Sequence, residues 1–129
     1  MDTPTDRKYT REHEWLQRTG NGTARMGLTA FAARELGDVV FVELPQPGFR
    51  GEAGEAAGTV ESVKAVAEFF LPVSGQVEVV NDALHDEPER LNDDPYGEGW
   101  LLDLALDDAG SLDGLLSAAE YDDFCAQEQ

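Results

Sequence analysis

The chain has 129 residues, the length of one compact domain, and its apolar content of 41% is enough to build a hydrophobic core. Its formal net charge is -18, so its surface repels phosphate backbones and anionic lipids, which excludes nucleic acid and membranes as partners. Cys125 is the only cysteine, which rules out an internal disulfide.

The N-terminal segment has no basic stretch followed by an apolar one, and no run approaches the roughly 20 apolar residues of a membrane span. We therefore expect a cytoplasmic protein of bacterial type, or the mature form of an organellar protein. The spacing of turn residues predicts a single domain over 1–129, with a core at about 9–106 and a C-terminal helical segment at about 111–127.

The first predicted element is a hairpin. Aromatic and apolar residues at strand-like positions over 9–11 and 13–16 predict extended chain. The turn residues at 19–22 then connect it to a return strand over 23–28. Short antiparallel strands are therefore expected from the start of the chain.

A short helix and another strand follow. Thr29 precedes good helix formers over 30–36, and Gly37 comes directly after them. This pattern predicts a two-turn helix with Thr29 as its N-cap and a C-terminal glycine. Branched and aromatic residues over 38–44 then predict a buried strand, which ends at a Pro-rich turn.

Lys64 is one of only two lysines in the chain, and it lies between two apolar runs at 58–60 and 66–71. These runs read as paired strands, and a Pro-x-x-Gly turn at 72–75 leads into a third strand over 76–80. An exposed lysine at the tip of a hairpin is the layout of a swinging-arm carrier domain. The alternative interpretation is an ordinary solvated lysine in a turn.

The last third of the chain predicts a long connection, one strand and a helix. Residues 81–99 should form a surface connection with one short helical turn near 87–90. A strand over 100–106 should close the sheet. Ser117 and Glu120 have the spacing of a capping box for a terminal helix. The residues expected to line one face of that helix are Leu115, Leu116, Tyr121 and Phe124.

Five segments, in this order and spacing, resemble the glycine cleavage H-protein family of lipoyl carriers. They are residues 8–15, 36–45, 61–65, 72–77 and 92–101. The resemblance implies a mainly β fold, a flattened antiparallel barrel-sandwich hybrid with short peripheral and C-terminal helices. Val63 and Ala65 flank the lysine where biotin carriers usually have methionines, and the chain lacks the long Ala/Pro linker of 2-oxoacid dehydrogenase lipoyl domains.

The resemblance implies that Lys64 carries lipoic acid as an amide, attached by a lipoate ligase or an octanoyltransferase. It also makes the neighbours Glu61, Ser62, Val63 and Ala65 candidates for recognition by that modifying enzyme. For Glu61 the alternative is an ordinary outward-facing strand carboxylate. The chain would supply a substrate amine rather than an active site, so a carrier and not an enzyme is expected.

The family's chemistry implies three further partners. A pyridoxal-phosphate-dependent glycine decarboxylase passes an aminomethyl group to the lipoyl arm, and a tetrahydrofolate-dependent aminomethyltransferase takes it. Dihydrolipoamide dehydrogenase then reoxidises the arm. A monomer is expected. Two alternatives stay open, namely a relay that donates octanoyl or lipoyl groups to other lipoyl domains, and an unmodified acidic binding module.

Four other polar residues are candidates for a functional role. By resemblance, Glu14 is the candidate to pair with the ammonium of the cargo in a cleft that partly excludes water, and the alternative is an ordinary strand-edge acid. His13 and His85 lack metal-ligand spacing with a second histidine or a cysteine, which favours hydrogen-bonded structural histidines and no metal site. Cys125 is expected to fill a helix face.

Overall fold

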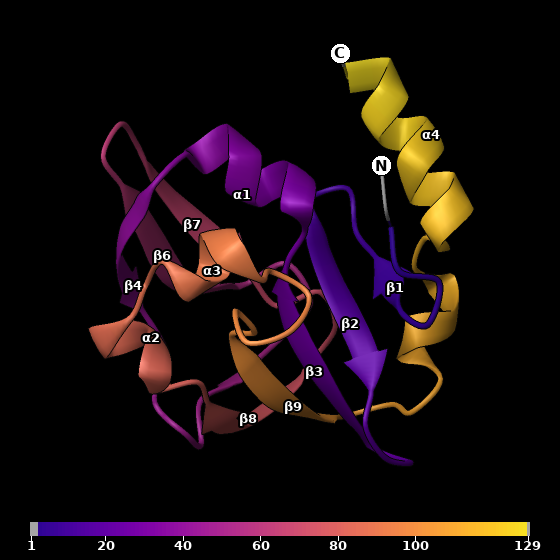
Figure 1. Cartoon of the computed structure of the whole chain (residues 1–129). Coiled ribbons are helices and arrows are strands. Elements are labelled where there is room, and N and C mark those ends of the chain that lie inside the picture. The colour runs from indigo at the N-terminus through magenta and orange to yellow at the C-terminus, as the bar shows by residue number, and fades with distance from the viewer. Residues whose placement is uncertain (1–2, 129) are drawn as a thin grey trace.

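The computed structural model describes residues 3–128, which form two antiparallel sheets with short helices around them (Figure 1). The larger sheet has the strand order β1 (Lys8–Tyr9), β2 (Glu14–Arg18), β3 (Thr23–Leu28), β9 (Leu102–Leu106), β8 (Gly75–Val80) and β5 (Arg50–Gly51). The smaller sheet has the order β4 (Val39–Glu43), β6 (Ala56–Ser62) and β7 (Val66–Phe70). The helical elements are α1 (Ala30–Leu36), α2 (Ala83–Asp86), α3 (Arg90–Asp93), the 3-10 turn η1 (Ser111–Gly114) and α4 (Ala118–Glu128).

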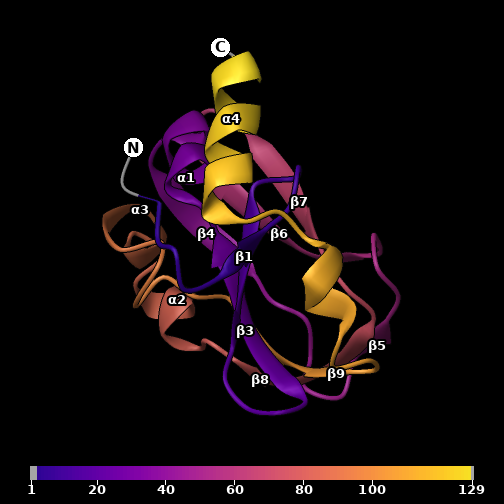
Figure 2. The ribbon, with the colours of Figure 1, turned by 90° about the vertical axis from the view of Figure 1, so that its right-hand side faces the viewer.

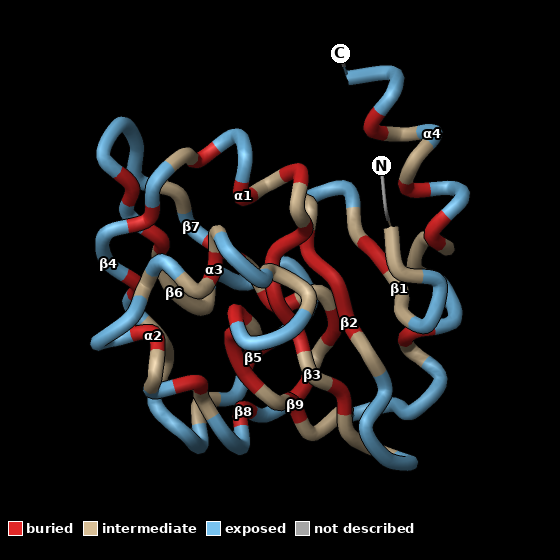
Figure 3. Tube along the Cα trace, viewed as in Figure 1, coloured by how far each residue is buried: buried red, intermediate tan, exposed pale blue. Residues whose placement is uncertain are grey.

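Both sheets contribute to one hydrophobic core. Its buried side chains include Leu16, Met26 and Leu104 from the larger sheet and Val60 and Phe69 from the smaller one. Figure 3 shows the buried segments concentrated along the inner strands. Because each sheet turns one face inward, the mainly β two-sheet fold expected from the resemblance is confirmed. Within residues 3–128, none of the helices is long and apolar enough to cross a membrane.

The predicted caps of α1 are both present. The Thr29 hydroxyl accepts a hydrogen bond from the Ala32 N–H at 3.3 Å. Gly37 follows the helix with φ of 79°, a left-handed conformation that favours glycine, and its N–H donates to the Ala33 carbonyl. The helix therefore ends where the sequence predicted, and the chain turns directly into β4.

The C-terminal helix stands at one side of the molecule, and its end projects beyond the sheets in both ribbon views (Figure 2). The predicted capping box is confirmed, since the Ser117 N–H donates to the Glu120 carboxylate and the Glu120 N–H donates to the Ser117 hydroxyl. Two of the residues expected on the helix face were predicted wrongly, because Leu115 and Leu116 both precede α4, which begins at Ala118. Leu116 instead pairs with Tyr9 of β1 as an isolated bridge, and this backbone pairing keeps it out of the helix.

Two other predictions need correction. The strand over 38–44 is not buried along its length, because Val40 is 50% exposed and Phe41 48% exposed beside a register shift between Val39 and Phe41. The β-bulge adds one residue and turns both side chains to solvent. The connection over 81–99 contains two helices, α2 and α3, rather than one turn, and each is anchored in the core by a leucine, Leu84 and Leu91.

Candidate functional site

Lys64 lies in the tight loop that joins β6 to β7. Glu61 and Val66 form the last cross-strand pair before this loop, and Lys64 is exposed. The loop projects at the upper left of Figure 1, and Figure 3 shows it as exposed. Val63 and Val66, on either side of the lysine, are 71% and 68% exposed. The predicted hairpin with an exposed lysine at its tip is confirmed, so an enzyme can reach the amine.

Ser62 stabilises the turn at the tip of the hairpin through its backbone and its side chain. Its N–H donates to the Ala65 carbonyl at 2.8 Å, which closes the turn. Its hydroxyl accepts hydrogen bonds from the N–H groups of Lys64 and Ala65, at 3.3 and 3.1 Å. Because the Ser62 side chain is buried in these contacts, it cannot touch a modifying enzyme directly. Ser62 would affect recognition only by fixing the shape of the turn. Glu61, Val63 and Ala65 are exposed and free to touch a modifying enzyme directly.

The end of α1 lies under the lysine side chain. A Cβ atom at Gly37 would sit 3.4 Å from Lys64 Cε, so the lysine stem rests over the glycine backbone. Sequence reasoning identified Gly37 as a helix end but missed this contact. Nothing in the local pattern links residue 37 to residue 64.

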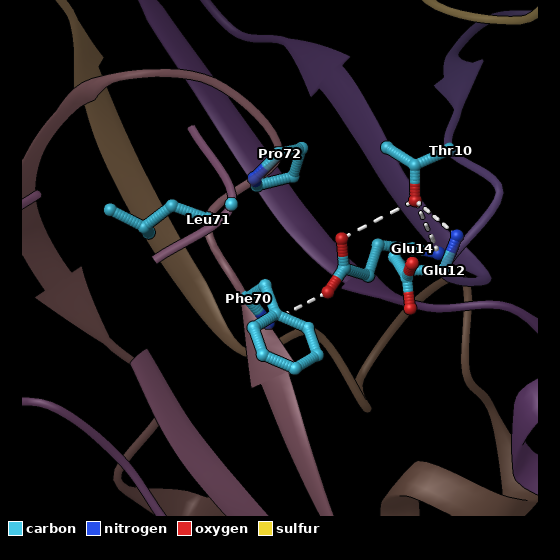
Figure 4. A pocket seen from close by; sticks show the side chains of 7 residues that line it. Thr10, Glu12, Glu14, Phe70, Leu71 and Pro72 are labelled. Carbon is cyan, nitrogen blue, oxygen red and sulfur yellow. Dashed lines mark hydrogen bonds between the residues drawn. The ribbon is translucent and has the colours of Figure 1, made fainter. Parts of the chain in front are cut away.

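A second feature is a pocket of about 240 Å³ beside the outer edge of β7 (Figure 4). It is lined by Thr10, Glu12, Glu14, Gly54, Phe70, Leu71 and Pro72. Figure 4 shows the Glu14 carboxylate between the two sides of this pocket. One Glu14 oxygen accepts from the Phe70 N–H at 2.8 Å, and the other accepts from the Thr10 hydroxyl at 3.3 Å. Glu14 therefore ties the β1–β2 loop to the end of β7.

The Glu14 carboxyl is in an unusual electrostatic environment. Its residue is only 1% exposed, and burial raises its pKa to about 7, although the Phe70 N–H and the Thr10 hydroxyl favour the ionised form. The nearby charge of Glu12 raises the pKa further. The alternative interpretation of Glu14 as an ordinary exposed strand-edge acid is therefore wrong. A buried carboxyl with a raised pKa in a small pocket marks a candidate functional site.

The lysine and the pocket lie along the same edge strand. Phe70 follows Lys64 by six residues, which corresponds to roughly 20 Å of extended chain. The lysine side chain alone is too short to span that length, so only a long attached group could bring Lys64 chemistry into the pocket.

His13 and Cys125 serve the structure. The two ring nitrogens of His13 lie 2.7 Å from the Tyr121 hydroxyl and 2.9 Å from a Glu128 oxygen, and the ring stacks on Phe31. This confirms His13 as a hydrogen-bonded structural residue that holds α4. Cys125 is buried on α4, as predicted for a helix-face filler. His85 is exposed on α2.

The fold and the exposed lysine together define a class of protein. An exposed lysine at the tip of a β-hairpin, in a fold of two antiparallel sheets with a pocket along the same edge strand, is the arrangement of a lipoyl-type carrier domain. The site offers an exposed amine, and a small pocket lies at the end of the same strand.

Comparison with known proteins identifies the family. The model of the family described as glycine cleavage H-protein matches residues 7–128. A probable glycine cleavage system H protein of Haloarcula marismortui is 54% identical over 95% of this chain and 96% of its own length. The glycine cleavage system H protein of Anaeromyxobacter sp. strain K is 48% identical over the full length of both chains. The chain therefore belongs to the glycine cleavage H-protein family.

A solved structure agrees with this assignment. The crystal structure of a glycine cleavage system H protein from Mycobacterium marinum superposes with a TM-score of 0.85 at 40% identity, covering 97% of this chain and 98% of that chain. The function expected from the resemblance is confirmed at the level of the family. The chain is a lipoyl-carrying, non-catalytic component of a glycine cleavage system.

Proposed function

We propose that Lys64 carries lipoic acid as an amide on its Nζ atom, and that the modified chain moves the aminomethyl group of glycine between enzymes. The observation that carries this proposal is the exposure of Lys64 at the tip of the β6–β7 hairpin. The other lysine, Lys8, is only half-exposed and lies in β1, paired with Leu16 of β2. A flat strand position does not present an amine to a modifying enzyme as a hairpin tip does.

Attachment requires an enzyme to recognise the tip. We assign direct recognition by a lipoate ligase or an octanoyltransferase to the exposed residues Glu61, Val63 and Ala65. Ser62 supports this recognition by holding the two amides that follow Val63. A free lysine amine is mostly protonated at neutral pH, so the modifying enzyme must supply the environment in which the amine reacts.

When bound, the lipoyl group supplies a reducible disulfide on a long tether, which can accept and release a one-carbon amine. The partners that follow are the pyridoxal-phosphate-dependent glycine decarboxylase, the tetrahydrofolate-dependent aminomethyltransferase and dihydrolipoamide dehydrogenase. With a net charge of -18, this chain would dock on basic surfaces of these partners. The cytoplasmic location and the monomeric state expected from the sequence remain predictions.

The pocket at Glu14 is the proposed binding place for the cargo. Phe70, Leu71 and Pro72 would shield a bound amine from water, and the Glu14 carboxylate would pair with its ammonium. An approaching ammonium favours the ionised form of Glu14, so the carboxyl gives up its proton as the cargo enters. The hydrogen bonds from Phe70 and Thr10 then hold the carboxylate oxygens in place.

Reconstitution with purified enzymes tests this function. The wild type, Lys64→Arg and Lys8→Arg are each treated with lipoate ligase and then assayed for glycine-dependent exchange of CO₂ with the decarboxylase component. We expect exchange with the wild type and with Lys8→Arg, and a complete loss with Lys64→Arg. Full exchange with Lys64→Arg would reject Lys64 as the carrier residue.

The same proteins distinguish the two remaining alternatives. Transfer of the acyl group from Lys64 to a second lipoyl domain, without glycine-dependent exchange, would support the relay function. A wild type that the ligase leaves unmodified would support an acidic binding module instead.

A further inference from the structure

Asn92, in α3, binds the segment between α1 and β4 with both ends of its side-chain amide. Its Oδ1 accepts from the Val39 N–H at 2.9 Å, and its Nδ2 donates to the Gly37 carbonyl at 2.8 Å. A longer contact of 3.5 Å joins Nδ2 to the Ala33 carbonyl. One side chain therefore satisfies the two backbone groups on either side of Asp38.

This pairing has the geometry of a neighbouring strand. β4 is an edge strand of the smaller sheet, so one side of its backbone has no strand partner there. The Asp38 carbonyl and the Val39 N–H belong to one planar trans peptide, so they point in opposite directions. The Gly37 carbonyl and the Val39 N–H point to one side, where the planar amide of Asn92 binds them. The Asp38 carbonyl is thereby turned to the opposite side, toward β6.

On that opposite side the Asp38 carbonyl meets the carrier hairpin. It accepts a hydrogen bond from the Val63 N–H at 3.0 Å, and Val39 pairs with Ser62 in the sheet. The amides of Lys64 and Ala65 are held by the Ser62 hydroxyl. Val63 is thus the tip residue whose amide depends on a segment outside the hairpin.

The same segment also touches the lysine side chain, because Lys64 Cε lies over Gly37. The segment 37–39 therefore supports the tip in two ways, through the Asp38–Val63 hydrogen bond and through the surface under the lysine stem. Asn92 binds this segment on the side away from the hairpin. It belongs to α3, which is distant from the hairpin along the chain. Leu91, the preceding residue, is fully buried and fixes α3 in the core.

We propose that Asn92 is a positioning residue for Lys64: by holding Gly37 and Val39, it aims the Asp38 carbonyl at Val63 and fixes the hairpin tip for modification. This inference rests on the proposed function of Lys64 as the lipoylated residue. An amide side chain is required because it combines one donor and one acceptor in a plane. An aspartate at 92 keeps the acceptor for Val39 but sets an oxygen against the Gly37 carbonyl.

The test compares Asn92→Ala with a matched variant, Asn81→Ala. Asn81 is also a structural asparagine, and its Nδ2 donates to the Glu98 and Trp100 carbonyls, both at 2.8 Å, but these bonds do not lead to the hairpin. Asn81→Ala loses these two side-chain hydrogen bonds, and Asn92→Ala loses two of similar length together with the longer contact to the Ala33 carbonyl. Three experiments are carried out on each folded, unmodified protein: urea unfolding for the midpoint, amide hydrogen exchange of Val63, and lipoylation by lipoate ligase for kcat and KM.

We expect both variants to lose similar global stability. Only Asn92→Ala should speed Val63 exchange, by roughly tenfold, the effect of about one net hydrogen bond. Only Asn92→Ala should raise the KM for lipoylation, by about three- to tenfold with little change in kcat, because the ligase binds only the fraction of molecules with the tip in place. If Asn92→Ala does not fold, the near-isosteric Asn92→Asp takes its place, and its effects should have the same direction but be smaller, because it loses the bond to the Gly37 carbonyl and keeps the acceptor for Val39.

Unchanged Val63 exchange in the Asn92 variant would overturn the proposal. An equal rise of KM in Asn81→Ala would also overturn it, because the rise would then come from the loss of global stability that both variants share. If the proposed function of Lys64 is wrong, the lipoylation assay fails already with the wild type, whereas the exchange experiment can still be carried out. If the wild type is not modified at Lys64 at all, Val63 exchange still reports whether Asn92 holds the tip.

Discussion

The burial of Glu14 predicts a specific pH dependence of stability, which Glu14→Gln should remove. Glutamine has nearly the same shape, and its carbonyl oxygen can accept from the Phe70 N–H. The bond from the Thr10 hydroxyl is lost, because the Thr10 oxygen already accepts from the N–H groups of Glu12 and Glu14, but this loss does not depend on pH. The substitution therefore removes the titration and leaves the packing intact.

The sign and size follow from the pKa of Glu14 in the two states. Burial raises the pKa from an ordinary value of 4.5 to about 7 in the folded protein. Between these two pH values the unfolded chain has lost the proton and the folded chain retains it, so the free energy of unfolding falls as pH rises. From pH 5 to pH 8 the wild type should lose about 2 to 3 kcal/mol relative to Glu14→Gln. Below pH 4.5 the carboxyl is protonated in both states and contributes no difference.

The assay is urea unfolding of both proteins at several pH values from 5 to 8, with the difference in unfolding free energy plotted against pH. Taking the difference cancels the titration of the other carboxylates. Glu12→Gln is the companion variant, because Glu12 lines the same pocket and its charge raises the pKa of Glu14 further, so this substitution should reduce the loss of stability between pH 5 and pH 8 without abolishing it. Parallel curves for the wild type and Glu14→Gln would refute the reasoning that Glu14 is buried with a raised pKa.

Gly58→Ala should cost about 3 kcal/mol in urea unfolding, since the new methyl group would overlap the Glu43 carbonyl oxygen. Gly22→Ala, which meets nothing within 4 Å, should cost far less, and equal losses would contradict this packing. Thr29→Val removes the N-cap of α1 and the 2.6 Å contact with the Tyr121 hydroxyl, so thermal unfolding should show a loss of about 2 kcal/mol; an unchanged melting temperature would count against it. Raising the salt concentration should raise the urea midpoint, because the net charge of -18 repels itself, and a midpoint that falls would argue otherwise.

The features that sequence reasoning predicted correctly are local ones. The Thr29 cap and the Ser117–Glu120 capping box depend on residues within one turn of each other, so their spacing carries the signal. The Lys64 hairpin is also local, because the two strands and the lysine between them lie in one continuous segment. For the same reason, an exposed lysine at the tip of a hairpin was predictable without a structure.

The features that it missed depend on contacts between distant segments. Leu116 matched a helix face by spacing, yet pairing with Tyr9 places it in a bridge. Val40 resembles a core residue in sequence, but the bulge in β4 exposes it. The burial of Glu14 depends on Phe70, and the support of the hairpin tip depends on Asn92. No periodic pattern in the chain encodes these pairings.

The most direct test of the central claim is peptide mass spectrometry of protein purified from its native host during growth on glycine. We expect one lipoyl group on the peptide that contains Lys64 and none on the peptide that contains Lys8. Lys64 found unmodified throughout, or a lipoyl group found on Lys8, would contradict the account.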